Sequence, residues 1–210
     1  MISIGHSNGP HPLQKHQLGD FALYYSIFAH FGKVRFYTQS DHLPADHKFF
    51  RAMTHWKDMF EVEIIEGRNQ PMPPETITAE THVHLAREHN IRMAPPNVIT
   101  KPDIDEPYVT YQTVGNTLKQ GPAEKIMEVA SATGHKLACI DNNSLPLDEF
   151  FGLLQNSEEH IGWDSGPAWL ACGMGKKVTM VVSGTKCGMD DHSDWREWGK
   201  STYPDTFKLI

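Results

Sequence analysis

Cysteine is scarce in this sequence, and long apolar runs are missing altogether. The three cysteines, Cys139, Cys172 and Cys187, are far apart and form no Cys-x-x-Cys motif, which predicts reduced thiols in a cytoplasmic protein rather than a disulfide framework. Because no apolar run reaches about 18 residues, no membrane span is predicted. The opening residues, MISIGHSNGPHP, lack a basic segment followed by an apolar one, so no signal peptide is expected.

An excess of basic residues is also missing. The 26 acidic and 19 basic residues give a net charge of −7, whereas a protein that binds along nucleic acid is more often basic, because phosphate contacts need lysine and arginine. Residues 48–57, KFFRAMTHWK, do mix basic and aromatic side chains. That pattern fits contact with nucleic acid, and it also fits an amphipathic helix whose aromatic face is buried.

Metal-binding patterns are absent from the sequence as well. The 13 histidines show neither a His-Glu-x-x-His spacing nor a paired Cys/His spacing. The nearest thing to an Asp-x-Asp metal pair is Asp190 beside Asp191, which we interpret as a solvated turn. We therefore expect no metal and no bound cofactor.

What the sequence does contain is two successive runs of alternating strand and helix patterns. In the first half, strands are expected at 1–4, 33–39 and 61–65, and helices at 20–32, 40–60 and 76–91. In the second half, strands are expected at 107–115, 135–141, 159–164 and 176–184, and helices at 123–134, 147–157 and 165–175. A proline-rich stretch, 92–107, separates the halves, and the tail, 190–210, is expected to hold a short helix and to pack back on the first half. The pattern predicts an α/β fold of two Rossmann-like units facing a cleft.

One stretch of the second half places a carboxylate directly before a helix. In residues 160–185, HIGWDSGPAWLACGMGKKVTMVVSGT, Asp164 stands between an expected strand and a helix that begins near Ser165. The free N–H groups at the start of such a helix suit a phosphate or a sugar hydroxyl. Asp164 also suits the N-cap position of the helix, so ligand binding and capping are both open from these residues alone.

The motif around Asp164 resembles a known enzyme family. Residues 164–178 follow the order D-S-G-P-A-x-L-A-x-x-x-G-K-x-V and precede a Gly-Thr turn, which is similar to the C-terminal half of the heptosyltransferase-like glycosyltransferases of the family 9 type. Two further places match in the same order: Gly19-Asp20 before the first expected helix, and Thr113 with Lys119 after the strand that opens the second half. The sequence departs from the family at Trp169, where the family has histidine, and family members are much longer.

The resemblance implies a compact GT-B fold, with residues 1–100 as the acceptor-side domain and residues 101–210 as the nucleotide-sugar domain. It implies an inverting, metal-independent hexosyl-, heptosyl- or pentosyltransferase that moves a sugar from a nucleotide-activated donor to an acceptor hydroxyl. Asp20 would be the general base, Lys119 would stabilise the departing diphosphate, and Asp164 would hold sugar hydroxyls. The full set of expected donor-binding residues is Thr113, Lys119, Asp164, Ser165, Gly166, Pro167 and Ala168.

Two classes of acceptor remain open. It is a saccharide, as the resemblance implies, or a hydroxymethylated base in DNA, since small viral glycosyltransferases share this fold and would act in the host cytoplasm. The residues that follow the first expected strand are predicted to line the acceptor side; they are His6, Ser7, Asn8 and His11. Two other functions stay open: a protein that binds a nucleotide or nucleotide sugar without turnover, and an epimerase or hydrolase on the same fold.

Overall fold

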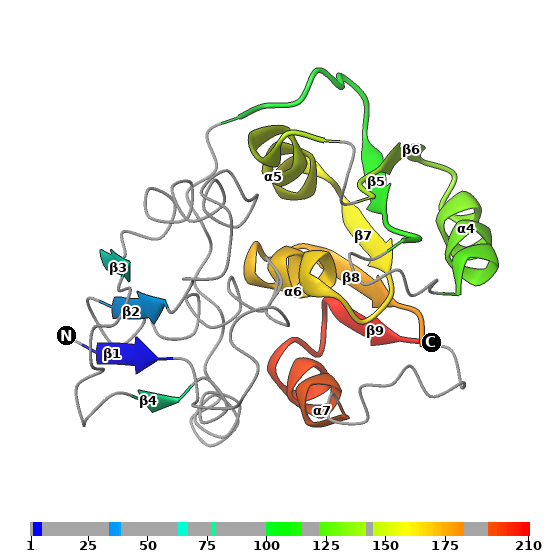
Figure 1. Ribbon diagram of the computed structural model, residues 1–210. Coiled ribbons are helices and arrows are strands. Elements are labelled where there is room, and N and C mark those ends of the chain that lie inside the picture. Colours follow the sequence, from blue (N-terminus) through cyan, green and yellow to red (C-terminus); the bar gives the residue numbers. More distant parts are fainter. Residues whose placement is uncertain are drawn as a thin grey trace. The chain divides into compact units, whose positions relative to one another are not determined.

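The chain divides into two compact units, Met1–Asn97 and Val98–Ile210 (Figure 1). The computed structural model describes residues 2–5, 34–38, 63–66, 77–78, 100–114, 122–141, 145–182 and 193–210. Each unit contains its own parallel sheet, and the helices of the second unit alternate with its strands. The expected α/β class is therefore confirmed.

The first unit holds a four-stranded parallel sheet in the order β3-β2-β1-β4. Its strands are β1 Ile2–Gly5, β2 Val34–Thr38, β3 Glu63–Glu66 and β4 Ile77–Thr78. The first three agree with the expected strands. The helix expected to begin at residue 76 is wrong at its start, because Ile77 pairs in parallel with Ile4 of β1, and β-branched residues such as isoleucine and threonine favour that pairing. The expected helices at 20–32 and 40–60 lie outside the described residues.

The second unit is built on a five-stranded parallel sheet in the order β6-β5-β7-β8-β9. The strands are β5 Tyr108–Tyr111, β6 Lys136–Cys139, β7 Glu159–Gly162, β8 Lys177–Met180 and β9 Phe207–Leu209. The helices are α4 Ala123–Ala132, α5 Leu147–Asn156, α6 Gly166–Gly173 and α7 Ser193–Thr202. Helix and strand alternate throughout, as the sequence pattern predicts for a parallel sheet.

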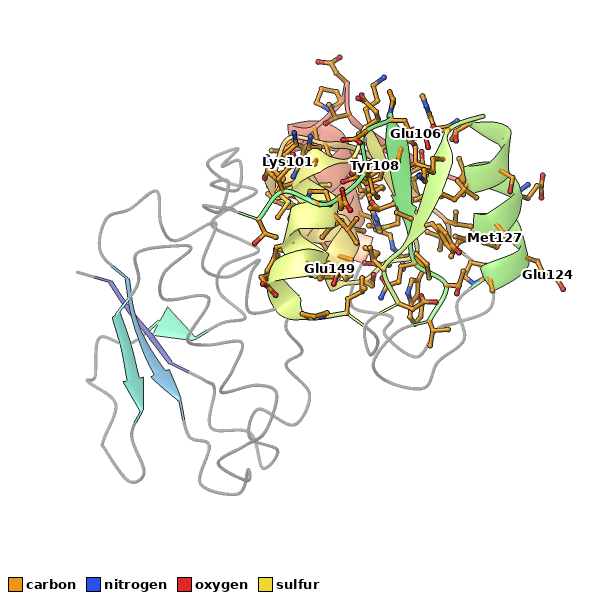
Figure 2. All side chains as sticks on the ribbon, turned by 90° about the horizontal axis from the view of Figure 1, so that it is seen from above. Lys101, Glu106, Tyr108, Glu124, Met127 and Glu149 are labelled. Carbon is orange, nitrogen blue, oxygen red and sulfur yellow. The ribbon has the colours of Figure 1, made fainter. Side chains whose placement is uncertain are left out.

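Helix α4 forms because its apolar residues recur at helical spacing. Ile126 and Ala130, four residues apart, are fully buried and lie on one face of the helix. Glu124 in the first turn points outward (Figure 2), where its charge interacts favourably with the positive end of the helix dipole. The chain leaves the helix at Gly134, whose φ of 72° is the left-handed conformation that glycine adopts without strain.

The two faces of the second sheet are covered by different helices. Side chains alternate between faces along a strand, so Val109 and Ile161 point to one face and pack with Ile126 of α4. Tyr108 points to the other face, where its hydroxyl donates to the Leu153 carbonyl of α5 at 2.9 Å. Figure 1 shows α4 on the opposite side of this sheet from α5, α6 and α7. Helices therefore cover buried side chains on both faces of the sheet, as in other parallel sheets.

The tail of the chain belongs to the second unit. The expected short helix is present as α7, and β9 extends the second sheet; the expected packing of the tail on the first half stays a prediction. Val178 of β8 pairs in parallel with Phe207 of β9, and Trp198 of α7 is 1% exposed. Burying this apolar surface against its own sheet fixes the tail there. In the described part of the chain, no helix has the length and apolar character needed to cross a membrane.

Candidate functional site at the carboxyl edge of the second sheet

The strand order of the second sheet reverses between β5 and β7. The chain passes from β5 to β6 on one side, and then returns past β5 to β7 on the other. In open parallel sheets, ligands bind at the carboxyl ends of the strands beside such a reversal. Gln112 and Thr113 follow β5 at this edge, and Asp164 and Ser165 follow β7. The structure therefore brings several of the predicted donor-binding residues to the position that the topology favours.

Gln112 and Ser165 join the two strands across this reversal. Ser165 Oγ donates to Gln112 Oε1 at 2.6 Å, and Gln112 Nε2 donates to the Val114 carbonyl at 3.1 Å. Because a carbonyl oxygen only accepts, the amide nitrogen of Gln112 must face Val114, and its amide oxygen must face Ser165. The hydroxyl proton of Ser165 is therefore used inside the protein, and its oxygen can only accept further hydrogen bonds.

Ser165, not Asp164, is the N-cap residue of α6. It has the extended conformation of an N-cap, with φ −153° and ψ 166°, and its side chain makes no capping hydrogen bond. The interpretation of Asp164 as the cap is therefore wrong. Pro167 has no N–H, and the N–H groups of Ala168 and Trp169 both donate to the Ser165 carbonyl, at 3.1 and 3.4 Å. Among residues 166–169, Gly166 is thus the one whose N–H donates to no described residue.

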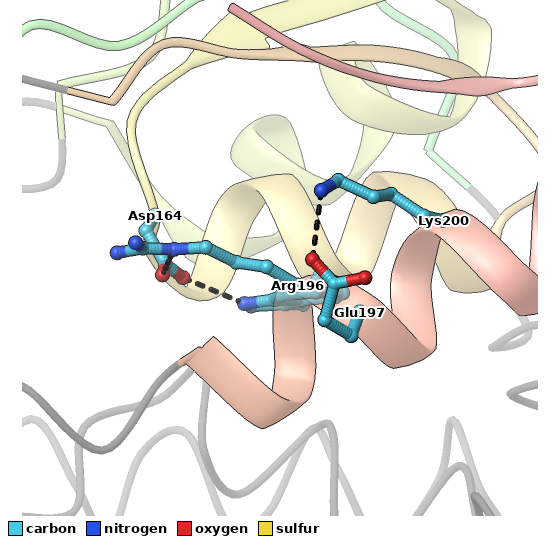
Figure 3. Close-up of polar contacts among 5 residues, drawn as sticks. Asp164, Arg196, Glu197 and Lys200 are labelled. Atoms are coloured by element: carbon cyan, nitrogen blue, oxygen red, sulfur yellow. Dashed lines mark hydrogen bonds and ion pairs between the residues drawn. The ribbon is translucent and has the colours of Figure 1, made fainter.

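Asp164 is held by side chains of its own unit. Its Oδ1 accepts from Trp169 Nε1 at 3.1 Å, and its Oδ2 accepts from Arg196 Nε at 2.7 Å (Figure 3). The side chains of Arg196 and Asp164 are 24% and 11% exposed, so water screens this ion pair less than a pair at the open surface. The carboxylate before α6 therefore ties the carboxyl end of β7 to α7.

Trp169 stands where the family that the sequence resembles has histidine, and here its indole makes structural contacts. Its ring is stacked on Phe207 with centroids 5.6 Å apart, and it lies 5.8 Å from the ring of Trp198. A Cβ added at Gly199 would lie 3.1 Å from the Trp169 ring, so the glycine lets α7 approach closely. With its indole N–H on Asp164, Trp169 links the aromatic core under α7 to the carboxylate at the sheet edge.

Asp141 fixes the turn that follows β5. Its Oδ1 accepts from the backbone N–H groups of Thr113 and Val114, at 2.9 and 3.0 Å. Its Oδ2 accepts from Thr113 Oγ1 at 3.1 Å and from Cys139 Sγ at 3.3 Å. Burial by itself raises the pKa of Asp141, but these hydrogen bonds to the ionised form outweigh it and lower the pKa below 3.8. The hydroxyl proton of Thr113, like that of Ser165, is therefore used internally.

The lowered pKa of Asp141 predicts a loss of stability in acid. A carboxyl whose pKa is lower in the folded protein stabilises the fold above its unfolded pKa, and it loses that contribution as the pH falls through the folded value. We expect Asp141→Asn to be less stable than the parent protein at neutral pH, and the gap to shrink as the pH falls below about 4. Urea unfolding at pH 7, 4 and 3 measures the gap. A gap that is constant over this range contradicts the role given to the charge.

His160 lies buried on β7, two residues before the strand ends at Gly162. Its Nδ1 is 3.2 Å from Thr110 Oγ1, and its Nε2 has no hydrogen-bond partner within the described ranges. A Cβ added at Gly162 would lie 2.7 Å from Nε2, so the ring extends along the strand over the glycine. Burial lowers the pKa of His160 to about 3, which keeps the imidazole neutral at physiological pH.

Several predicted site residues lie outside the described residues. Conversely, the sequence prediction lacks Gln112, Asp141 and Arg196. Gln112 stands near the end of the expected strand 107–115, and Asp141 ends the next one, so polar residues at strand ends were the available signal for both. Arg196 offers no local signal, because its partner is 32 residues away. The predicted site residues that lie outside the described ranges are Asp20, Lys119, His6, Ser7, Asn8 and His11.

No protein-family model and no curated protein sequence matches this chain. Its fold does match solved structures of the dodecameric iron-containing glycosyltransferase TibC from enterotoxigenic E. coli H10407. One such structure has a TM-score of 0.55 and 16% identity, and the match covers 86% of this chain and 58% of TibC. The chain is therefore similar in fold to this glycosyltransferase. A second TibC structure, described as a heptosyltransferase in complex with ADP-D-β-D-heptose, has a TM-score of 0.53 and 15% identity over the same 86% and 58%.

The chain spans 58% of the length of TibC, and TibC contains iron. Within the described ranges of this chain, no group of three or more His, Cys, Asp and Glu side chains could hold a metal ion. Cys139 and Cys172 lie on separate elements, β6 and α6. Burial is the main cause that raises the pKa of both thiols, and metals bind the thiolate rather than the thiol.

Proposed function

We propose that the protein is a glycosyltransferase and that its second unit binds a nucleotide-activated sugar. The proposal rests on the carboxyl edge between β5 and β7, where Ser165 of the donor motif bonds to Gln112 at 2.6 Å. Parallel sheets bind nucleotides at this position. The similarity in fold to TibC, which has been solved with ADP-D-β-D-heptose, supports the same function.

The finer assignments follow the family resemblance. We propose a GT-B arrangement with an acceptor-side domain and a donor-side domain, and an inverting transfer that needs no metal. Asp20 would take the proton from the acceptor hydroxyl, since base catalysis needs a carboxylate or an imidazole near that proton. Lys119 would contribute positive charge to the departing diphosphate.

Donor binding can be tested by thermal unfolding with ADP-heptose, UDP-glucose and GDP-mannose. A ligand that binds the folded protein stabilises it by about 2.7 kcal/mol at 100 times its Kd, so Tm should rise by several degrees with the true donor. Isothermal titration calorimetry with the same donor then gives the affinity. We expect one nucleotide series to raise Tm and the others to have little effect.

Turnover separates the enzyme from a binding protein. Release of the nucleoside diphosphate, followed with saccharide acceptors and with hydroxymethylated DNA, is expected for one acceptor class. Release of free sugar without any acceptor would indicate a hydrolase instead. Binding of a donor with no turnover on any acceptor would leave a nucleotide-sugar binding protein. The absence of both binding and turnover contradicts the proposed function.

A further inference from the structure

A diphosphate needs hydrogen-bond donors, and those predicted phosphate-binding residues that the structure describes supply few of them. Phosphate oxygens at neutral pH mostly accept. The hydroxyl protons of Ser165 and Thr113 are already donated, to Gln112 and Asp141. Pro167 has no N–H, and the Ala168 N–H is donated to the Ser165 carbonyl. Within the described ranges, a bound diphosphate therefore needs hydrogen-bond donors from a residue outside this predicted set.

Among the described residues of this edge, Arg196 has the donors that Ser165, Thr113 and Pro167 lack. Its Nε donates to Asp164 at 2.7 Å, and no described residue accepts from its two terminal Nη groups. The side chain is 24% exposed, so ligand can reach it while most of its length stays packed. Helix α7 follows β8 in a parallel sheet and leads back to β9, which places the first turns of α7 at the carboxyl edge. Arg196 therefore presents a guanidinium group, the side chain best matched to phosphate oxygens, at the same edge as the donor motif.

Asp164 and Trp169 hold this guanidinium in place. The carboxylate of Asp164 contacts the Nε side of Arg196 and leaves the Nη groups directed beyond it (Figure 3). Trp169 fixes the carboxylate through its indole N–H at 3.1 Å, and its own ring is buried against Phe207. A side chain that is fixed before the ligand arrives loses less conformational entropy on binding.

We infer that Arg196 binds the phosphate groups of the donor and that Asp164 acts as a positioning residue for it. This inference rests on the proposed function, since it assigns a role within the same donor site. It gives the carboxylate before α6 a different task from the expected one: Asp164 orients a cation that holds the diphosphate, and it does not itself hold sugar hydroxyls.

The test measures the affinity for nucleoside diphosphates by calorimetry. ADP, UDP, GDP and CDP are titrated into the unaltered protein, and the tightest ligand is kept. Arg196→Gln is expected to weaken its binding by about 10- to 100-fold, the usual effect of losing charged hydrogen bonds. Affinity for the matching nucleoside, which has no phosphate, should not change.

Lys200→Gln is the matched control. Lys200 lies on the same helix and pairs with Glu197 at 2.7 Å (Figure 3). Unlike the pair of Arg196 and Asp164, these two side chains are 46% and 63% exposed. The same change of charge should therefore alter diphosphate affinity by less than about twofold. Wild-type affinity in Arg196→Gln overturns the inference and leaves the proposed function standing. Failure of the unaltered protein to bind any nucleoside diphosphate or nucleotide sugar overturns both.

The positioning role of Asp164 has its own readout. Asp164→Asn is expected to weaken diphosphate binding in the otherwise unaltered protein and to have no further effect in the Arg196→Gln protein, because the two residues act as one unit. A purely structural role would weaken binding equally in both backgrounds, and that result contradicts the assignment.

A further test uses only the unaltered protein, so its result does not depend on whether a variant folds. Phenylglyoxal modifies accessible guanidinium groups, and mass spectrometry of the Arg196 peptide gives the rate of modification. Saturating nucleoside diphosphate is expected to slow the modification severalfold, whereas the nucleoside is expected to leave it unchanged. Equal rates with and without the diphosphate contradict the inference.

Discussion

Replacing Trp198 by alanine should destabilise the second unit by about 3–5 kcal/mol, the usual range for a large aromatic residue removed from a core. Trp198 is 1% exposed, and its ring lies 5.8 Å from Trp169 and 5.7 Å from Tyr203. Its loss would leave a cavity between α7 and the sheet that rigid neighbours cannot fill. Since whole domains are stable by only about 5–15 kcal/mol, urea unfolding followed by circular dichroism should show a large fall in midpoint.

Met127→Ala is the control for this substitution. Met127 lies on α4 and is 36% exposed, so its truncation should cost less than about 1 kcal/mol. Trp198→Ala should also weaken diphosphate binding, because Arg196 lies two residues earlier on the same helix. A midpoint that falls no further in Trp198→Ala than in Met127→Ala contradicts the view that Trp198 anchors α7.

Replacing Asp20 by asparagine should lower kcat by about 100-fold or more, since a positioned general base commonly contributes 10²- to 10⁴-fold. Asparagine keeps the size of the side chain and removes its ability to take a proton. Affinity for the donor should be nearly unchanged, because the base acts on the acceptor. Steady-state kinetics with the acceptor that supports turnover, together with calorimetry for the donor, separate the two quantities.

Asp191→Asn makes the same change of charge at a residue interpreted as solvated, and it should keep wild-type turnover. Melting of both variants has to be measured beside activity, because Asp20 is expected at the start of a helix, where a capping carboxylate would also stabilise the fold by about 1 kcal/mol. If Asp20→Asn retains full turnover with the true acceptor, the base is another residue of the first loop, and His6 and His11 are then the candidates.

Local sequence patterns predicted the longer described elements and missed the two shortest ones. Helix α4 was expected from the three- and four-residue spacing of its apolar residues, and Gly134 from the need for a left-handed residue. Strands β4 and β9 have two and three residues, too few for a periodic pattern. They exist because Ile77 and Phe207 find distant partners, on β1 and β8, and a sequence window holds no information on such partners.

The site shows the same division between local and distant information. Ser165 and Gly166 could be located from the motif that contains them, because a turn between strand and helix is a local structure. The hydrogen-bond partners of Asp164 and Thr113 could not be located from a local motif. Arg196 lies 32 residues from Asp164, and Asp141 lies 28 residues from Thr113, so only the packed sheet brings them together. The direction of each hydrogen bond, which decides what a ligand must offer, also follows only from the assembled network.

The close contact between His160 and Gly162 should restrict which substitutions are accepted at these two positions. A methyl group at position 162 would lie 2.7 Å from the imidazole Nε2, and His160 is fully buried, so neither residue can change size alone without cost. Among descendants of this sequence, a larger residue at position 162 should therefore appear only where position 160 has already become smaller. The two positions should covary, and glycine should persist at 162 for as long as histidine persists at 160.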